Sequence, residues 1–359
     1  MTQKKLRTAI LGLTQKGLGL LEAAFQTGLF DIQAAADNDP KLAEQISGKY
    51  DCTPFNDYRQ LVIQNQLDVL LVGAPSHMCQ EYIYAAMKKG IHIVKLLPPA
   101  LNFEQTAELV RTAKKNAVLF VPANTLRFSP PFCRLRECLN SEDIEAFHLI
   151  TAVVNIPEPT DTPRDRWLSD PKLAGGGVLL QNCYEIIDQI VLNFGIPQQV
   201  YSLNTNRAPD KQQRLSITED SAVVTMKFSD TLMGNIIASR TLGPAQLLLT
   251  LNNRDKQFVV SEKTITVRDN SGNVIEHSKY EPAGTKSTEK MLESFAMSIL
   301  APQEKKPSDD VLVDLKNMAV IESAYLSART AMPEEPAKIL HMANTEPTNI
   351  WPSGAERIV

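Results

Sequence analysis

At 359 residues the chain is long enough to form two domains, each with its own core. Hydrophobic residues make up 43% of it and charged residues 22%, which is typical of a globular protein. The formal net charge of -4 provides no basic field, so we do not expect binding to nucleic acid or to an anionic membrane.

The first third of the chain alternates between two kinds of segment. Short apolar runs typical of strands occupy residues 8–13, 31–36, 67–72, 92–96 and 118–121, and helix-like segments occupy 18–26, 40–50, 77–89 and 103–116. Strands that alternate with helices imply right-handed crossovers and a doubly wound parallel sheet. We therefore predict an N-terminal α/β domain over residues 1–123.

After residue 123 strand-like runs dominate, separated by short polar turns. They cover residues 144–155, 199–206, 222–228, 234–239, 246–251, 257–260 and 264–268. This succession predicts a large, mostly antiparallel sheet, accompanied by helices at 178–194 and 311–330. We assign residues 124–340 to this second α/β domain and 341–359 to a polar tail.

The five cysteines are odd in number and include no C-x-x-C pair. This usage favours free thiols in a reducing compartment and argues against a disulfide framework or a zinc site. Glycines within residues 12–17 interrupt the first apolar stretch too early for a signal peptide or a membrane span. We therefore expect a cytoplasmic protein.

The turn at residues 12–17, GLTQKG, resembles a dinucleotide fingerprint with one departure. Gly12 and Gly17 are kept, but Thr14 stands where the second glycine lets the backbone approach a pyrophosphate. Its side chain would crowd the phosphates, although its hydroxyl could donate a hydrogen bond to them. Asp37 follows the second strand, where an acid accepts hydrogen bonds from a ribose diol. The absence of an arginine soon after it favours NAD over NADP, and the alternative is an ordinary strand–helix turn.

Further landmarks appear in the order found in one oxidoreductase family. They include ADNDP at 36–40, APSH at 74–77, NTLRFSP at 124–130, Trp167 and the triple glycine at 175–177. From residue 6 to 339 the chain resembles the Gfo/Idh/MocA family of glucose–fructose oxidoreductases and inositol dehydrogenases. The resemblance implies a Rossmann domain that binds NAD(P) and hydride transfer at a carbinol carbon of a sugar or polyol. It also implies homo-oligomer contacts through the open face of the second sheet.

The chain departs from this family at its principal catalytic positions. The family's catalytic lysine falls at Leu97, and its helical aspartate and histidine fall at Gln181 and Glu185, while Asp188 is kept. Hydride transfer needs a group that takes or supplies the hydroxyl proton, and such a group contributes about 10²–10⁴-fold in rate. The usual proton chemistry of the family is therefore missing.

Three ionisable residues are candidate replacements. Glu185 lies four residues after Gln181 on one predicted helix, so the two should share a face, and a desolvated carboxylate there can act as a base. Lys95 precedes Leu97 by two residues on a strand, and Tyr184 is a phenol next to Glu185. The alternatives are a solvated helix acid for Glu185, a strand-end surface lysine for Lys95 and a packing aromatic for Tyr184.

The remaining candidates follow from the turn and from the resemblance. The candidates for cofactor binding are Gly12, Thr14, Gln15, Gly17, Asp37, Ala74, Pro75, His77 and Pro98. Candidates for contact with substrate are Arg127, Trp167 and Gln181. His77 is equally consistent with a helix cap and Trp167 with packing. Dispersed histidines and cysteines predict no metal site.

Three functions remain open at this point. The first is a protein that binds a nicotinamide nucleotide and a sugar- or polyol-like ligand but is catalytically silent, as a sensor or as the partner of an active relative. The second is an active NAD-dependent oxidoreductase on a sugar, inositol or related polyol that uses a different acid–base group such as Glu185. The third is a lyase- or hydrolase-type reaction on a sugar. Of these we favour the first.

Overall fold

The computed structural model describes residues 4–157, 166–207, 213–214, 217–241, 243–281, 284–302 and 310–342. The chain divides into two compact units, of which the first comprises Met1–Thr125 with Gly284–Val311 and the second Leu126–Ala283 with Leu312–Val359. The contiguous division expected from the sequence assigns residues 284–311 to the second domain. They belong to the first unit because helix α11 (Lys286–Leu300) packs against α1 (Gln15–Thr27).

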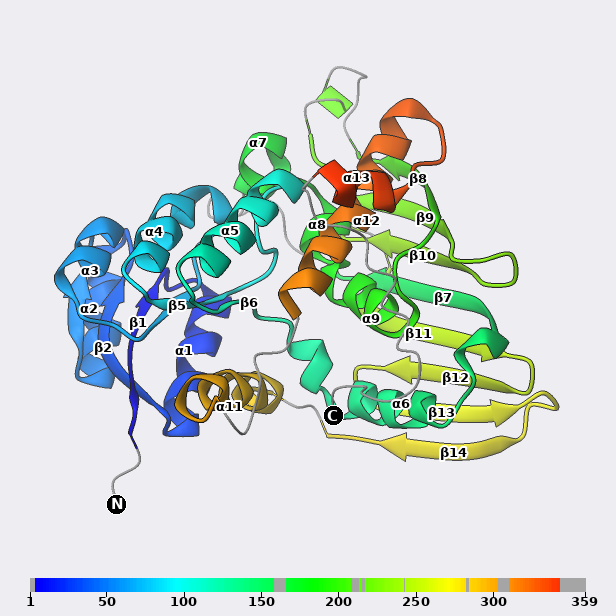
Figure 1. Ribbon diagram of the computed structural model, residues 1–359, viewed down its shortest axis with the longest axis horizontal. Coiled ribbons are helices and arrows are strands. Elements are labelled where there is room, and N and C mark those ends of the chain that lie inside the picture. The colour runs from blue at the N-terminus through cyan, green and yellow to red at the C-terminus, as the bar shows by residue number, and fades with distance from the viewer. Residues whose placement is uncertain are drawn as a thin grey trace. The chain divides into compact units, whose positions relative to one another are not determined.

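The first unit contains the predicted doubly wound parallel sheet (Figure 1). Its strand order is β3-β2-β1-β4-β5-β6. Its strands are β1 (Leu6–Leu11), β2 (Phe30–Ala36), β3 (Thr53–Phe55), β4 (Val69–Val72), β5 (His92–Lys95) and β6 (Phe120–Pro122). All neighbouring strands are parallel. The strand order reverses between β1 and β4, so ligands are expected beyond the carboxyl ends of these strands.

Besides α1 and α11, the described residues of the first unit form four helices. They are α2 (Pro40–Tyr50), α3 (Tyr58–Gln64), α4 (Ser76–Lys88) and α5 (Phe103–Lys115). Asp39 and Asn102 cap α2 and α5 by accepting hydrogen bonds from amides of the first turn. The sequence did not indicate β3 or α3, because elements of three and seven residues are too short to show a periodicity.

The second unit contains the predicted large sheet, with strand order β14-β13-β12-β11-β7-β10-β9-β8. Its strands are β7 (Phe147–Asn155), β8 (Gln199–Thr205), β9 (Ser221–Lys227), β10 (Met233–Ser239), β11 (Gln246–Asn253), β12 (Lys256–Ser261), β13 (Thr264–Asp269) and β14 (Val274–Lys279). Among these described strands, β7 and β10 pair in parallel, and the other neighbouring pairs are antiparallel.

Helices pack against one face of this sheet (Figure 1), among them α6 against β12 and β13 and α8 against β9 and β10. The described helices of this unit are α6 (Pro130–Asn140), α7 (Pro171–Ala174), α8 (Val178–Gln181), α9 (Tyr184–Phe194), α12 (Asp310–Thr330) and α13 (Pro336–Met342), and its 3-10 turns are η1 (Thr125–Phe128), η2 (Ile144–Ala146) and η3 (Arg166–Ser169). Buried and exposed residues alternate along β9, as expected for a sheet with one covered and one open face.

The single helix predicted over residues 178–194 is wrong, since the chain forms α8 and α9 with a break between them. At the break, the amide nitrogens of Asn182 and Cys183 both donate to the carbonyl oxygen of Val178. The hydrogen-bond pattern of the helix is therefore interrupted after Gln181. The prediction that Gln181 and Glu185 share one helical face loses its basis, because it assumed an unbroken helix.

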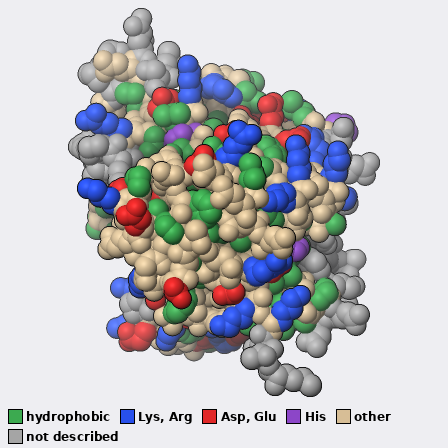
Figure 2. Space-filling view, turned by 90° about the vertical axis from the view of Figure 1, so that its left-hand side faces the viewer, with side chains coloured by type: hydrophobic (Ala, Val, Ile, Leu, Met, Phe, Trp, Pro, Cys, Tyr) green, Lys and Arg blue, Asp and Glu red, His purple; other side chains and the backbone are tan. Residues whose placement is uncertain are grey.

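Charges of both signs are interspersed on the face of the molecule drawn in Figure 2. Among the described residues, none of the helices has the length and apolar character needed to cross a membrane. Within the same residues, no group of three or more His, Cys, Asp or Glu side chains is arranged to hold a metal ion.

Candidate functional site

The turn between β1 and α1 packs backbone against backbone at three glycines. Gly12 has a φ of +88°, and a Cβ atom on it would lie 2.4 Å from the amide nitrogen of Ala74. A Cβ atom on Gly17 or on Gly73 would lie 2.4 Å from the carbonyl oxygen of Gly12. Only glycine fits at these places. Gly73 was not singled out from the sequence, although a glycine directly after the buried run 67–72 is the signal that could have found it.

Thr14 caps α1 and ties the turn to the end of β4. Its Oγ1 accepts a hydrogen bond from the Gly17 amide at 3.1 Å and donates to the carbonyl oxygen of Gly73 at 2.9 Å. The Thr14 hydroxyl donates its proton to the Gly73 carbonyl oxygen. In this structure that proton is therefore not available for the hydrogen bond to a phosphate that the sequence suggested. The amino end of α1 still provides a partial positive charge for an anion.

Asp37 is held as a fixed carboxylate just beyond the carboxyl end of β2. Its Oδ2 accepts from the Leu13 amide at 2.7 Å and its Oδ1 from the Asp39 amide at 3.0 Å. An ionised carboxylate has further lone pairs, so each oxygen can still accept a hydrogen bond from a ribose hydroxyl. The geometry therefore presents an oriented hydrogen-bond acceptor next to the glycine turn.

The other cofactor candidates lie on the same unit. Ala74 contacts Gly12 directly, and Pro75 is the cap residue of α4, whose first turn contains the half-buried His77. Gln15 is exposed at the start of α1, and Pro98 follows β5. Since the strands are parallel, the segments that follow them meet at one edge of the sheet. A glycine cradle, a helix amino end and an acidic acceptor together fit a nicotinamide dinucleotide.

Lys95 is buried in the core of the first unit. Its side chain is 2% exposed, and its Nζ donates to the carbonyl oxygens of Leu96 at 2.9 Å and Pro98 at 2.7 Å. Burial lowers the pKa of this ammonium group. The surface interpretation is wrong, and the buried position argues against proton exchange with a substrate. Leu97, at the family's lysine position, is half-buried.

Tyr184 is buried as well, at 1% exposure. Its hydroxyl donates to Oδ1 of Asp314 on α12 at 2.7 Å. Burial and the neighbouring carboxylate raise the pKa of the phenol well above its usual value, so it keeps its proton at neutral pH. This environment fits the packing interpretation of Tyr184 and argues against a catalytic one.

Glu185 and Gln181 are both half-buried in the second unit. Oε1 of Glu185 accepts a hydrogen bond from the Leu126 amide at 2.9 Å. Nε2 of Gln181 donates to the carbonyl oxygen of Ala174 at 2.7 Å. Of the three ionisable candidates, Glu185 is therefore the one whose side chain is not buried.

Arg127, a candidate for substrate contact, forms a buried ion pair with Asp188. Its Nε donates to Oδ2 of Asp188 at 2.8 Å, and a second guanidinium nitrogen donates to Oδ1. Asp188 is 0% exposed and also accepts from Nδ2 of Asn317 at 2.7 Å. The contacts tie η1 to α9 and α12, so they give both Arg127 and the retained Asp188 a structural role.

Two glycines of the triple glycine, Gly176 and Gly177, are explained by two residues that the sequence did not single out. A Cβ atom on Gly176 would lie 2.0 Å from the hydroxyl oxygen of Tyr325, and one on Gly177 would lie 1.8 Å from the carbonyl oxygen of Glu219. The Glu219 carboxylate accepts from the amides of Gly177 and Leu179 and from the Tyr325 hydroxyl, which anchors the start of α8. A glycine in the sequence indicates that another group packs closely on the backbone there, but it does not indicate which residue provides that group.

Trp167 is half-buried in η3. The carbonyl oxygen of the following residue, Leu168, accepts a hydrogen bond from the Thr218 hydroxyl at 2.6 Å. Its contact with a substrate stays a prediction.

Sequence profiles of known families match most of the chain. Residues 6–124 match an oxidoreductase family with an NAD-binding Rossmann fold, and residues 132–262 match the GFO/IDH/MocA C-terminal domain.

Individual relatives are more distant. The chain is 26% identical over 200 residues to the D-xylose 1-dehydrogenase (NADP(+)) 2 of Haloferax volcanii, covering 55% of this chain and 60% of that protein. It is 23% identical over 192 residues to the 2,7-anhydro-N-acetylneuraminate hydratase of Mediterraneibacter gnavus, covering 54% of this chain and 50% of the relative. The chain thus spans little more than half the length of these curated relatives.

Solved structures share the fold over nearly the whole chain. A levoglucosan dehydrogenase in complex with NADH and levoglucosan superposes with a TM-score of 0.81 at 15% identity, covering 92% of this chain and 99% of that one. At this identity the likeness concerns the fold alone.

Proposed function

This chain belongs to the GFO/IDH/MocA oxidoreductase family, and we propose that it binds NAD and a sugar- or polyol-like ligand without transferring hydride between them. Such a protein would act as a ligand sensor or as the silent partner of an active relative. The observation that carries this proposal is the turn after β5, where apolar Leu97 occupies the lysine position and neighbouring Lys95 is buried in the core.

The nucleotide would lie along the carboxyl edge of the first sheet. Gly12, Gly17 and Gly73 let the turn pack closely against the end of β4, and the amino end of α1 favours the negative charge of the pyrophosphate. Asp37 would accept hydrogen bonds from the adenosine ribose and would repel a 2′-phosphate, which favours NAD over NADP. Ala74, Pro75 and His77 would flank the dinucleotide from the start of α4. A bound nicotinamide supplies the hydride-carrying carbon.

Replacing Asp37 tests this nucleotide site. Asp37→Ala should weaken NAD binding by about 1–3 kcal/mol, the cost of losing hydrogen bonds to a charged acceptor. Calorimetric titration with NAD measures this change. Titration with NADP should show a smaller loss of affinity, because the variant also loses the repulsion between the Asp37 carboxylate and the 2′-phosphate of NADP. Asp57→Ala is the matched control, since Asp57 caps α3 by accepting from two backbone amides. No binding by the unmodified protein at millimolar NAD would remove the proposal.

Catalysis is proposed to be absent because the family's three proton-exchanging positions have changed chemistry. Neither Leu97 nor Gln181 can take up or release a proton at neutral pH. Gln181 is also turned toward the Ala174 carbonyl by its own hydrogen bond. A missing acid–base group lowers the rate by about 10²–10⁴-fold. Ligand binding does not require that group, so it can persist without turnover.

An active oxidoreductase is the second candidate, and the environment of Glu185 favours it. One carboxylate oxygen is oriented by the Leu126 amide, and the side chain is half-buried rather than solvated. An oriented, partly desolvated carboxylate is a plausible general base. The protein would then oxidise a polyol, and Glu185→Gln would lower kcat about 100-fold while leaving NAD affinity unchanged.

We further propose that two copies of the chain associate through the open face of the second sheet. In-register pairing aligns five apolar residues across five strands: Leu203, Val223, Ile237, Val153 and Leu248. Leu203 is 60% exposed and Ile237 47% exposed. A contiguous apolar row on an open sheet face is typical of a surface that a partner covers, and a second copy presents the same row.

A charge at the centre of this row should disrupt the association. Ile237→Lys places an ammonium on each copy in an apolar interface, where it has no counter-ion, so the protein should shift toward the monomer. Sedimentation velocity at micromolar protein measures the change. Ile63→Lys is the matched control, because Ile63 is 58% exposed on α3. A monomeric unmodified protein, or an Ile237→Lys variant that still associates, would contradict the proposal.

A further inference from the structure

Lys95 is a buried cation whose hydrogen-bond acceptors are neutral. The ammonium group donates to two backbone carbonyls, those of Leu96 and Pro98, and no carboxylate is among its partners in the part of the chain that the structure describes. Burying a charge costs free energy unless hydrogen bonds compensate it. The buried lysine therefore indicates that nearby backbone carbonyls depend on its N–H donors.

The need arises from the turn that follows β5. Pro98 and Pro99 have no amide hydrogen, so the turn cannot be closed by their backbone donors. The Leu96 amide donates backwards to the Val72 carbonyl, and the Leu101 amide donates forwards to Oε1 of Gln105. Between these two points, the Lys95 ammonium bridges the carbonyls on either side of Leu97.

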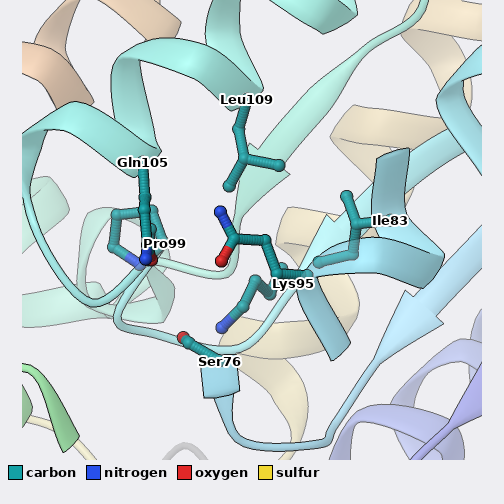
Figure 3. A pocket seen from close by; sticks show the side chains of 8 residues that line it. Ser76, Ile83, Lys95, Pro99, Gln105 and Leu109 are labelled. Carbon is teal, nitrogen blue, oxygen red and sulfur yellow. The ribbon is translucent and has the colours of Figure 1, made fainter. Parts of the chain in front are cut away.

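The Lys95 ammonium lies in a closely packed part of the first unit. Figure 3 shows Lys95 among residues from α4, α5 and the turn, with Ser76 beside its amino group. The pocket that they line is too narrow to admit a water molecule. No other ionisable side chain lines this pocket, and the buried Cys79 thiol on α4 is the other titratable group that interacts with the ammonium. Without Lys95, the carbonyl of the buried Pro98 would keep only the Ser76 hydroxyl, at 3.5 Å, among the side-chain donors that the structure describes.

We propose that Lys95 is a positioning residue, which fixes the Leu96–Pro99 turn and so places Leu97 and Pro98 at the carboxyl edge of the sheet. The turn adjoins the segment after β4, because β4 and β5 are parallel neighbours and the Ser76 hydroxyl lies 3.5 Å from the Pro98 carbonyl. The link from this turn to NAD rests on the proposed function. The fixing of the turn itself rests on the contacts alone.

Lys95→Met tests the inference, because methionine keeps the length and apolar stem of lysine but has no donor. Hydrogen exchange of the Leu96 and Leu101 amides, followed in peptides covering residues 93–104, should accelerate about tenfold, the effect of roughly one lost hydrogen bond. NAD should bind about tenfold more weakly for the same reason. The melting temperature should stay within about 5 °C or rise, since replacing a buried charge with an apolar group is often neutral or stabilising.

Lys89→Met is the matched control, since the Lys89 ammonium also donates to backbone carbonyls, those of Val62 and Ile63. It should leave both the turn and NAD affinity unchanged. Lys95→Leu, which is shorter and also has no donor, serves in place of Lys95→Met if the latter does not fold. Unchanged exchange at Leu96 and Leu101 would overturn the inference, as would faster exchange throughout the first unit. If the unmodified protein binds no NAD, the nucleotide proposal fails while the exchange result still decides the role of Lys95.

Discussion

The variant Leu97→Lys/Gln181→Asp/Glu185→His should gain NAD-dependent dehydrogenase activity, by about 10²–10⁴-fold over the unmodified protein. It restores the three proton-exchanging side chains of the family at their positions in this chain. NADH absorbance across a panel of sugars, inositols and their keto forms measures the gain.

The matched control is Gln181→Asp/Glu185→His, which lacks the lysine and should remain inactive. The helix break between α8 and α9 does not remove the rationale, because the positions are taken from the family and not from a shared helical face. Turnover by the unmodified protein at a rate similar to that of the triple variant would contradict the proposal of a silent protein. If Glu185→Gln then abolished that turnover, the second candidate function would stand.

Arg127→Met should lower the free energy of unfolding by about 3–5 kcal/mol, because it leaves the Asp188 carboxylate buried without its cation. Asp188 has no contact with solvent and retains only the Asn317 amide among the donors described above. Urea denaturation followed by circular dichroism measures the loss. The double variant Arg127→Met/Asp188→Leu should recover much of it, since an apolar pair can replace a buried ion pair.

Arg134→Met is the control for this experiment. Arg134 pairs with Glu276, but the side chains are 39% and 26% exposed, so the loss should stay below about 1 kcal/mol. A loss of that small size for Arg127→Met would contradict the structural role of the pair and would return Arg127 to the candidates for substrate contact.

The order of strands and helices was predictable because both domains repeat simple patterns. Buried parallel strands appear as apolar runs, as in Val69–Val72, and the glycine turn at 12–17 marks the strand–helix junction. The return of α11 to the first unit was not predictable, because local periodicity does not say which core a helix joins. The break after Gln181, where the Asn182 and Cys183 amides share the Val178 carbonyl, was also missed.

Lys95 shows why side-chain roles are harder to predict than elements. A lysine at a strand end usually reaches solvent, and nothing local indicates that two carbonyls will face inward beside it. Thr14 is similar, because its hydroxyl bonds to Gly73, a residue that comes close only when β1 and β4 pair. In both cases the deciding partner is a backbone carbonyl, which the sequence cannot single out.

A crystal structure of the protein with bound NAD tests the central claim most directly. The account predicts a dinucleotide on the glycine turn, its adenosine ribose on Asp37, and Leu97 rather than an ionisable side chain within reach of the nicotinamide C4. An empty nucleotide site would contradict the binding half of the claim. A carboxylate from Glu185 within hydrogen-bonding distance of a ligand hydroxyl beside C4 would contradict the silent half.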